Sequence, residues 1–213
     1  MLLRSLKSCP QARPPALGRG ERPIEMLDPR LVLGRLPNSE RDLNAQYEST
    51  FGLLVSSNCP PYESEYINSK FAFQRSNSLA DINGFYHAFG LTTADGHPER
   101  PDHVVLELEF MACLLGLERR AADEDSTRRT DHQQVCRDAQ SRFLQEHLGW
   151  WTPAFAKLLS VGDPQGFYAA AGDFLAALIP AERALLELPP SSQPAAPSTV
   201  ERPELCEGCQ LGG

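Results

Sequence analysis

Apolar residues along this chain recur at the 3.6-residue period of a helix, and no stretch of convincing length alternates as a half-buried strand would. The most apolar stretch begins at His103, and its first stripe continues through Leu106, Phe110, Leu114 and Leu117. A second stripe lies beside the first and consists of Val104, Leu108, Met111 and Leu115. A helix that is apolar over so wide an arc is expected at the centre of its domain.

A second amphipathic segment covers residues 38–55. Asn38 or Ser39 is expected to cap this helix, because a short polar side chain accepts a hydrogen bond from an N–H group of the first turn. Tyr47 and Phe51 are one turn apart on the predicted apolar side, which favours a place in the core. The full stripe predicted for this helix is Leu43, Tyr47, Phe51 and Leu54.

A third helix is predicted over residues 78–89. Ser78 with Asp81 three residues later resembles a capping box, in which two side chains satisfy N–H groups at a helix start. Gly90 follows the last apolar residue, and glycine readily adopts the left-handed conformation that ends many helices. The apolar residues expected to face inward are Leu79, Ile82, Phe85, Tyr86 and Phe89.

The last third of the domain predicts three more helices. The first covers residues 131–148 and is expected to end at Gly149. Thr152-Pro153 and Asp163-Pro164 each place a capping residue before a proline suited to the first helical position. Pro180 is expected to stop or kink the last helix. The inward residues predicted over 131–148 are Val135, Ala139, Phe143, Leu144 and Leu148.

Together these elements predict an all-α fold, a single-domain bundle of about six helices over residues 38–188. Residues 1–37 begin with closely spaced prolines and glycines and are expected to have little order. Residues 189–213 are rich in proline, serine and alanine and are expected to form a disordered tail. Flexible segments are thus predicted at both ends of the domain.

Composition and charge narrow the class of protein. A chain of 213 residues is long enough for one domain that folds without disulfide bonds. Its net charge of -8 disfavours nucleic acid as a partner and favours basic ones. No apolar run approaches the roughly 18 residues of a membrane span, so a soluble protein without stable membrane insertion is expected.

Three polar residues at the start of the central helix are candidates for binding chemistry. Glu99, Asp102 and His103 lie where the positive end of the helix dipole favours carboxylates. A histidine beside carboxylates can exchange hydrogen bonds with a polar ligand near neutral pH. The simpler interpretation makes Asp102 a helix-terminal carboxylate and His103 a half-buried helix residue.

Three motifs, in this order along the chain, resemble the TorD/DmsD family of molybdoenzyme-assembly chaperones. Residues 47–51 (Tyr-Glu-Ser-Thr-Phe) are similar to the family's Tyr-x-x-Leu-Phe element, with Thr50 in place of leucine. Residues 59–66 resemble its Pro-Tyr-Glu-Ser loop, and residues 99–103 resemble its Glu-Pro-x-Asp-His signature. In this chain the proline of the signature is one place later, at Pro101, after Arg100. The family also has several helices before the first motif, which predicts that the N-terminal segment is truncated.

The resemblance implies a cytoplasmic, non-enzymatic chaperone without a cofactor or a bound metal. Such a protein binds the twin-arginine signal peptide of a molybdopterin-dependent oxidoreductase and holds the apo-enzyme until its cofactor is inserted, before export. The catalytic subunit of that enzyme is the implied partner, and a homodimer is a further expectation. The residues expected to contact the peptide are Tyr47, Phe51, Glu99, Asp102 and His103.

Two other functional interpretations stay open at this point. One is a small metal-dependent hydrolase that uses His103, Glu107 and the cysteines, among them the terminal Cys206-x-x-Cys209 pair. The other is a degraded family member that binds nothing. No phosphate-binding glycine loop, nucleophile elbow or His-Glu-x-x-His motif is present in the sequence, which favours a binding protein over an enzyme.

Overall fold

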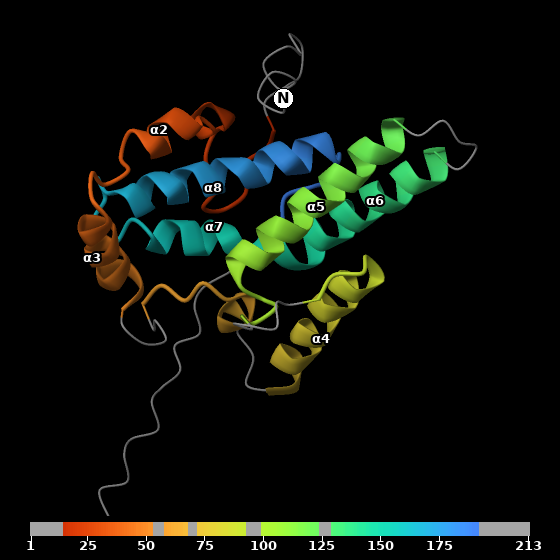
Figure 1. The fold of residues 1–213 in the computed structure, drawn as a ribbon, viewed down its shortest axis with the longest axis horizontal. Coiled ribbons are helices and arrows are strands. Elements are labelled where there is room, and N and C mark those ends of the chain that lie inside the picture. Colours follow the sequence, from red (N-terminus) through yellow and green to blue (C-terminus); the bar gives the residue numbers. More distant parts are fainter. Residues whose placement is uncertain (1–14, 53–57, 68–71, 93–98, 124–128, 192–213) are drawn as a thin grey trace, which may run out of the picture.

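The computed structural model describes residues 15–52, 58–67, 72–92, 99–123 and 129–191, and over these ranges it is all-α, as predicted (Figure 1). Its α-helices are α2 (Pro29–Leu33), α3 (Glu40–Phe51), α4 (Ala72–Ala88), α5 (Val104–Asp123), α6 (Arg129–Phe143), α7 (Gly149–Leu158) and α8 (Phe167–Leu185). Two 3-10 turns, η1 (Ile24–Met26) and η2 (Glu63–Tyr66), and a π-helical turn, η3 (Leu144–Leu148), join them. None of the helices in these ranges has both the length and the apolarity to cross a membrane.

Helices α5 and α6 form a long pair that carries an aromatic core. Phe110 of α5 and Phe143 of α6 are both buried, with ring centroids 4.7 Å apart. Tyr86 of α4 closes over them, with its ring centroid 5.0 Å from that of Phe110. The predicted stripe of α5 is confirmed at Phe110 and Leu114, whereas the α6 prediction fails at Val135, which is 57% exposed.

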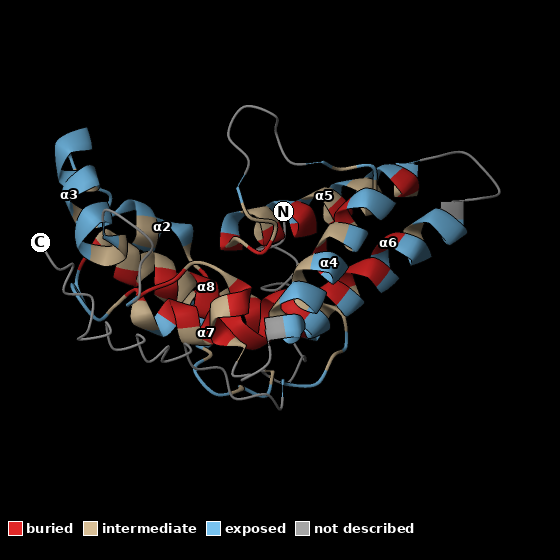
Figure 2. Cartoon of the chain, turned by 90° about the horizontal axis from the view of Figure 1, so that it is seen from below, coloured by how far each residue is buried: buried red, intermediate tan, exposed pale blue. Residues whose placement is uncertain are grey.

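Helices α7 and α8 form the second pair, and most of their residues are buried (Figure 2). They cross closely at Gly172, where an added Cβ would lie only 2.5 Å from the carbonyl oxygen of Ala156. Trp151 and Phe155 of α7 pack in the core beneath this crossing, with ring centroids 5.6 Å apart. Each of the two helix pairs therefore has its own buried cluster, and Leu108 of α5 packs against both clusters.

The two helix pairs are joined by an unbroken helical path from α6 through η3 into α7, which corrects two predicted boundaries. Gly149 does not end a helix but begins α7, and its missing side chain makes room for the Leu144 carbonyl. Thr152 is not an N-cap, because its buried hydroxyl donates to the Leu148 carbonyl at 2.7 Å. The π turn supplies the extra residue that keeps the path continuous.

Two other predicted boundaries differ as well. Helix α4 begins at Ala72, so Ser78 lies inside it and the predicted capping box does not form. The Ser78 hydroxyl instead donates to Glu63 at 2.9 Å. Helix α8 continues past Pro180 to Leu185, because tight packing of this helix outweighs the lost backbone hydrogen bond. The predicted Ser39 cap of α3 and the closing Gly90 of α4 are confirmed, with Gly90 at φ 70°.

Residues 15–37 lie along α8, although the sequence predicted little order over 1–37. The Arg22 N–H donates to the Ala176 carbonyl at 3.0 Å, and the Arg35 side chain donates to the Gln165 carbonyl at 2.7 Å. Arg183 of α8 forms a buried ion pair with Glu21. Prolines and glycines exclude a long helix here, but they permit short turns that are held by contacts with α8.

Candidate functional site

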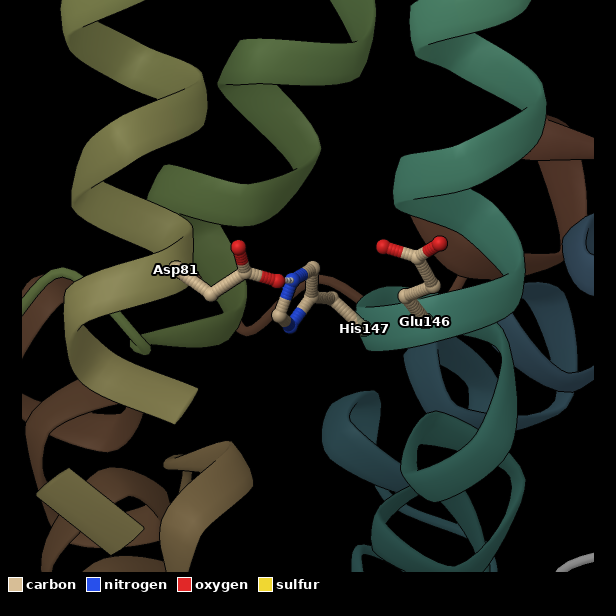
Figure 3. A group of neighbouring side chains, drawn as sticks. All are labelled: Asp81, Glu146 and His147. Carbon is tan, nitrogen blue, oxygen red and sulfur yellow. Dashed lines mark hydrogen bonds and ion pairs between the residues drawn. The ribbon is translucent and has the colours of Figure 1, made fainter. Parts of the chain in front are cut away.

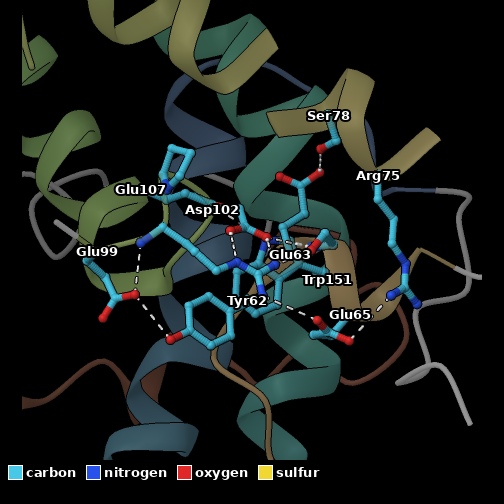
Figure 4. Close-up of polar contacts among 12 residues, drawn as sticks. Tyr62, Glu63, Glu65, Arg75, Ser78, Glu99, Asp102, Glu107 and Trp151 are labelled. Atoms are coloured by element: carbon cyan, nitrogen blue, oxygen red, sulfur yellow. Dashed lines mark hydrogen bonds and ion pairs between the residues drawn. The ribbon is translucent and has the colours of Figure 1, made fainter. Parts of the chain in front are cut away.

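The two family-like loops meet in the structure. The 59–66 loop and the 99–104 segment, together called the junction below, pair through an antiparallel bridge between Tyr62 and His103. Figure 4 shows Tyr62, Glu99 and Asp102 of the junction with their polar contacts. The Glu63 N–H donates to the Asp102 carbonyl at 3.0 Å, and the Val104 N–H donates to the Pro61 carbonyl at 2.9 Å. The second bond satisfies one of the free N–H groups at the start of α5, so the loop acts as a backbone cap for the central helix.

Asp102 holds the junction together from inside. Its side chain is fully buried, and its Oδ2 accepts hydrogen bonds from the Ser64 N–H at 3.0 Å and from Arg100 Nη2 at 2.9 Å. Its Oδ1 accepts from Arg100 Nε at 3.1 Å. Arg100 also donates to Glu65 at 3.4 Å, and its guanidinium carbon lies 4.2 Å above the ring of Tyr62. The carboxylate of Asp102 is therefore occupied by an arginine of its own chain.

Glu99 and His103 lie at the outer side of the junction. Glu99 is exposed, and its carboxylate accepts from the Tyr62 hydroxyl at 3.1 Å. His103 is half-buried against Tyr62, with ring centroids 5.2 Å apart, and its Nδ1 accepts from the Val105 N–H at 3.2 Å. Burial lowers the pKa of His103, which outweighs the opposite effect of Glu99 and Asp102. At neutral pH the ring is neutral, with Nε2 as its donor.

Tyr47 and Phe51 lie apart from the junction, on α3. Their ring centroids are 5.0 Å apart, and Phe51 packs edge-on against Tyr168 of α8 at 5.1 Å. Tyr47 is 52% exposed, so it belongs to the surface rather than to the core. The structure thus brings Glu99, Asp102 and His103 together and leaves these two aromatic residues in a separate group.

A buried polar cluster lies directly beneath the junction. Glu63 is 2% exposed and lies 3.0 Å from Nδ1 of His147, which is also buried. The indole N–H of Trp150 donates to Glu63 at 3.3 Å, and that of Trp151 donates to Glu107 at 3.1 Å. Neither Glu63 nor His147 was predicted for this role from the sequence. The signal was present, because His147 lies one turn after Phe143 on the apolar side of its helix.

Glu107 is a fully buried carboxyl group close to a second one. Burial and the charge of Glu63 raise its pKa well above the ordinary value of 4.5, and the hydrogen bond from Trp151 only partly offsets them. Glu107 therefore keeps its proton to a higher pH than an exposed carboxyl group does, which disfavours a second negative charge beside Glu63.

The raised pKa of Glu107 predicts a specific pH dependence of stability. Because the folded pKa exceeds the unfolded one, the contribution of Glu107 is complete below the unfolded pKa and is lost as pH rises through the folded pKa. Glu107→Gln keeps an acceptor for Trp151 and cannot ionise, so we expect it to unfold at a higher denaturant concentration than the native chain at pH 9. The advantage should shrink towards pH 5. Urea unfolding followed by circular dichroism from pH 5 to 9 measures this difference.

Glu109→Gln is the matched control, because Glu109 is exposed on the same helix. It should shift the urea midpoint by about the same small amount at every pH. A Glu107→Gln difference that did not change with pH would show that Glu107 is ionised throughout, contrary to this assignment.

The ligand set of the predicted hydrolase is not formed among the described residues. His103 turns its Nδ1 to the Val105 N–H, whereas Glu107 faces Trp151 in the core. Burial raises the pKa of the Cys59 thiol to about 12, which keeps it protonated and poorly nucleophilic. Cys206 and Cys209 lie outside the described residues.

An open cleft of about 830 Å³ lies between α4 and the start of α7, on the other side of the 59–66 loop. Its lining includes Glu63, Tyr66, Ser78, Asp81, Glu146 and His147. The cleft therefore has an acidic lining with one imidazole, a set of groups suited to a cation.

Comparison with known proteins shows the family to which these residues are similar. A model of the nitrate reductase delta subunit family matches residues 23–157, which include the whole junction. The chain is 35% identical over 112 residues to the selenate reductase assembly chaperone protein of Thauera selenatis, covering 53% of this chain and 54% of that protein. It is 34% identical over 112 residues to the chlorate reductase assembly chaperone protein of Ideonella dechloratans, with the same coverage.

A third relative matches over a longer range at lower identity. The chaperone protein TorD of Photobacterium profundum is 26% identical over 149 residues, which are 70% of this chain and 66% of that protein. The chain spans about half to two thirds of the length of these curated relatives.

Proposed function

The chain belongs to the nitrate reductase delta subunit family, and the relatives it matches are named as chaperones. On this basis we propose that it is an assembly chaperone in the cytoplasm for a molybdopterin-dependent oxidoreductase. It would bind the twin-arginine signal peptide of the catalytic subunit and hold the apo-enzyme before export. The family match over residues 23–157 carries this proposal, because it includes the junction and because the relatives are named as assembly chaperones.

The outer side of the junction supports binding of the arginines. Glu99 is exposed, and a carboxylate forms charge-assisted hydrogen bonds with a guanidinium group that contribute roughly 1.5–3 kcal/mol each. His103 offers an Nε2 donor beside it. The net charge of -8 favours the approach of a basic segment. In this proposal Asp102 does not contact the peptide, because its carboxylate already accepts hydrogen bonds from Arg100. It positions the loop that carries the contact residues.

The aromatic group on α3 and α8 supports binding of the apolar part of the peptide. Tyr47, Phe51 and Tyr168 pack against one another with tilted or edge-on rings, and Tyr47 presents much of its ring to solvent. An apolar run of a signal peptide gains free energy by covering such rings. The predicted homodimer stays a prediction.

The test is a calorimetric titration of the full chain with a synthetic twin-arginine signal peptide from a molybdoenzyme. We expect micromolar or tighter binding, and at least tenfold weaker binding of the same peptide with both arginines changed to glutamine. Equal affinity for both peptides, or no binding of signal peptides from several molybdoenzymes by the folded chain, would contradict the proposal.

A further inference from the structure

Three side chains in the lining of the cleft lie close to one another (Figure 3). Asp81 extends from α4, and Glu146 and His147 extend from the π turn η3. Nε2 of His147 lies 3.1 Å from Oδ2 of Asp81, and one potential ligand atom from each of the three residues lies within 4.8 Å of the other two. This cluster is distinct from the outer side of the junction, where the peptide is proposed to bind.

The hydrogen bonds of His147 require a cation at this place. Both ring nitrogens face carboxylates, Nδ1 towards Glu63 at 3.0 Å and Nε2 towards Asp81 at 3.1 Å. A neutral imidazole carries only one hydrogen, so it can donate to only one of them. Glu63 is buried and held by Ser78 and Trp150, which makes it the fixed acceptor for Nδ1–H. The Nε2 lone pair then faces a carboxylate, and a proton or a metal ion must lie between them.

The charge around His147 favours the metal ion over the single proton. Glu63, Asp81 and Glu146 together carry three negative charges around one imidazole. Among the described side chains, Arg142 is the basic residue that contacts one of these three carboxylates, with its Nη2 3.3 Å from Oε2 of Glu146. The side chains of Asp81 and Glu146 are 55% and 43% exposed, so both can rotate onto a shared ion without repacking the core.

We propose that Asp81, Glu146 and His147 bind a divalent transition-metal ion such as Zn²⁺. The separation of 3.1 Å between Nε2 and Oδ2 is close to the roughly 3.3 Å between ligands that lie about 2.0–2.1 Å from a tetrahedral zinc. Glu63 serves as the second carboxylate that orients a ligating histidine through its other nitrogen. The imidazole favours zinc, cobalt or nickel over magnesium or calcium.

Three protein ligands leave a fourth coordination position, and the cleft gives it access to solvent or to a side chain of a partner. The ion would also tie α4 to η3, since one ligand comes from α4 and two come from the π turn. Binding therefore stabilises the folded chain, as a ligand of the folded state does in general.

The test uses the full chain after dialysis against a chelator, titrated calorimetrically with ZnCl₂ at pH 7. We expect one ion per chain with micromolar or tighter affinity, a higher melting temperature with zinc, and no comparable effect of MgCl₂. Asp81→Asn and Glu146→Gln keep the side-chain size at exposed positions and should each weaken zinc binding at least tenfold. Asp138→Asn is the matched control on α6 and should leave the affinity unchanged.

Cysteine thiols also bind zinc, so a second variant separates the two sources. Cys206→Ser combined with Cys209→Ser should retain the ion and its dependence on Asp81. Cobalt added in place of zinc gives an independent readout, because its visible spectrum distinguishes oxygen and nitrogen ligands from thiolates. The proposal is overturned if the native chain binds no zinc, if Asp81→Asn and Glu146→Gln bind it as well as the native chain, or if the cysteine changes abolish binding.

Discussion

Asp102→Ala is expected to lose about 3 kcal/mol of unfolding free energy, because it removes a buried carboxylate that joins two loops. The change leaves the Ser64 N–H without its acceptor and frees Arg100 from two of its bonds. An unpaired buried donor alone costs roughly 1–3 kcal/mol. Arg100 is 39% exposed, so water solvates part of its released charge and limits the loss. Urea unfolding monitored by circular dichroism measures the effect.

Asp102→Asn separates the charge from the shape at this position. The amide keeps the volume and one acceptor oxygen, so we expect roughly half the loss of the alanine variant. Asp138→Ala removes an exposed carboxylate from α6 and should change stability by less than about 0.5 kcal/mol. If Asp102→Ala matched this control, the junction would not depend on Asp102.

Trp151→Ala is expected to have the largest effect, a loss of about 3–5 kcal/mol. The indole is fully buried, and its ring centroid lies 5.1 Å from that of Tyr66 and 5.6 Å from that of Phe155. Its removal opens a cavity between η2 and α7 and also takes away the hydrogen bond to Glu107. The loss is measured by chemical unfolding, with Trp150 as the remaining tryptophan for fluorescence.

Trp151→Phe distinguishes packing from hydrogen bonding. A phenyl ring fills most of the space but has no N–H group for Glu107, so we expect a loss of about 1–2 kcal/mol. A Phe variant as unstable as the Ala variant would assign the whole effect to the hydrogen bond. An Ala variant that lost less than about 1 kcal/mol would contradict the central place of Trp151 in this core.

Local periodicity was enough to predict the all-α class and the central helix. The stripe that contains Phe110 and Leu114 follows the 3.6-residue period, and packing confirms it at both positions. The ends of the helices were harder to predict, because a residue typical of a helix end can instead make a contact with a distant part of the chain. Ser78 has the sequence context of a cap, yet its hydroxyl bonds to Glu63 from inside a helix. Gly149 has the context of a helix end, yet it makes room for the Leu144 carbonyl.

The candidate site was predicted in its location but not in its contacts. The motif at residues 99–103 led to the start of α5, where Glu99 and His103 lie at the outer side of the junction. The hydrogen bonds between Arg100 and Asp102 form where two loops pair that are far apart in the sequence. The spacing of residues within either loop does not reveal this pairing. Glu63 and His147 were missed because charged residues are usually exposed, and Glu107 was considered only as a metal ligand of the hydrolase alternative.

The proposed peptide site is tested most directly by calorimetric titration of a twin-arginine signal peptide into the native chain and into the double variant Glu99→Gln, His103→Ala. Glu99 is exposed and His103 is only half-buried, so the variant should keep the native helix content and unfold cooperatively, as circular dichroism can check. We predict micromolar binding by the native chain and at least tenfold weaker binding by the variant. Equal binding by the two folded proteins would contradict the assignment of the peptide site to the junction.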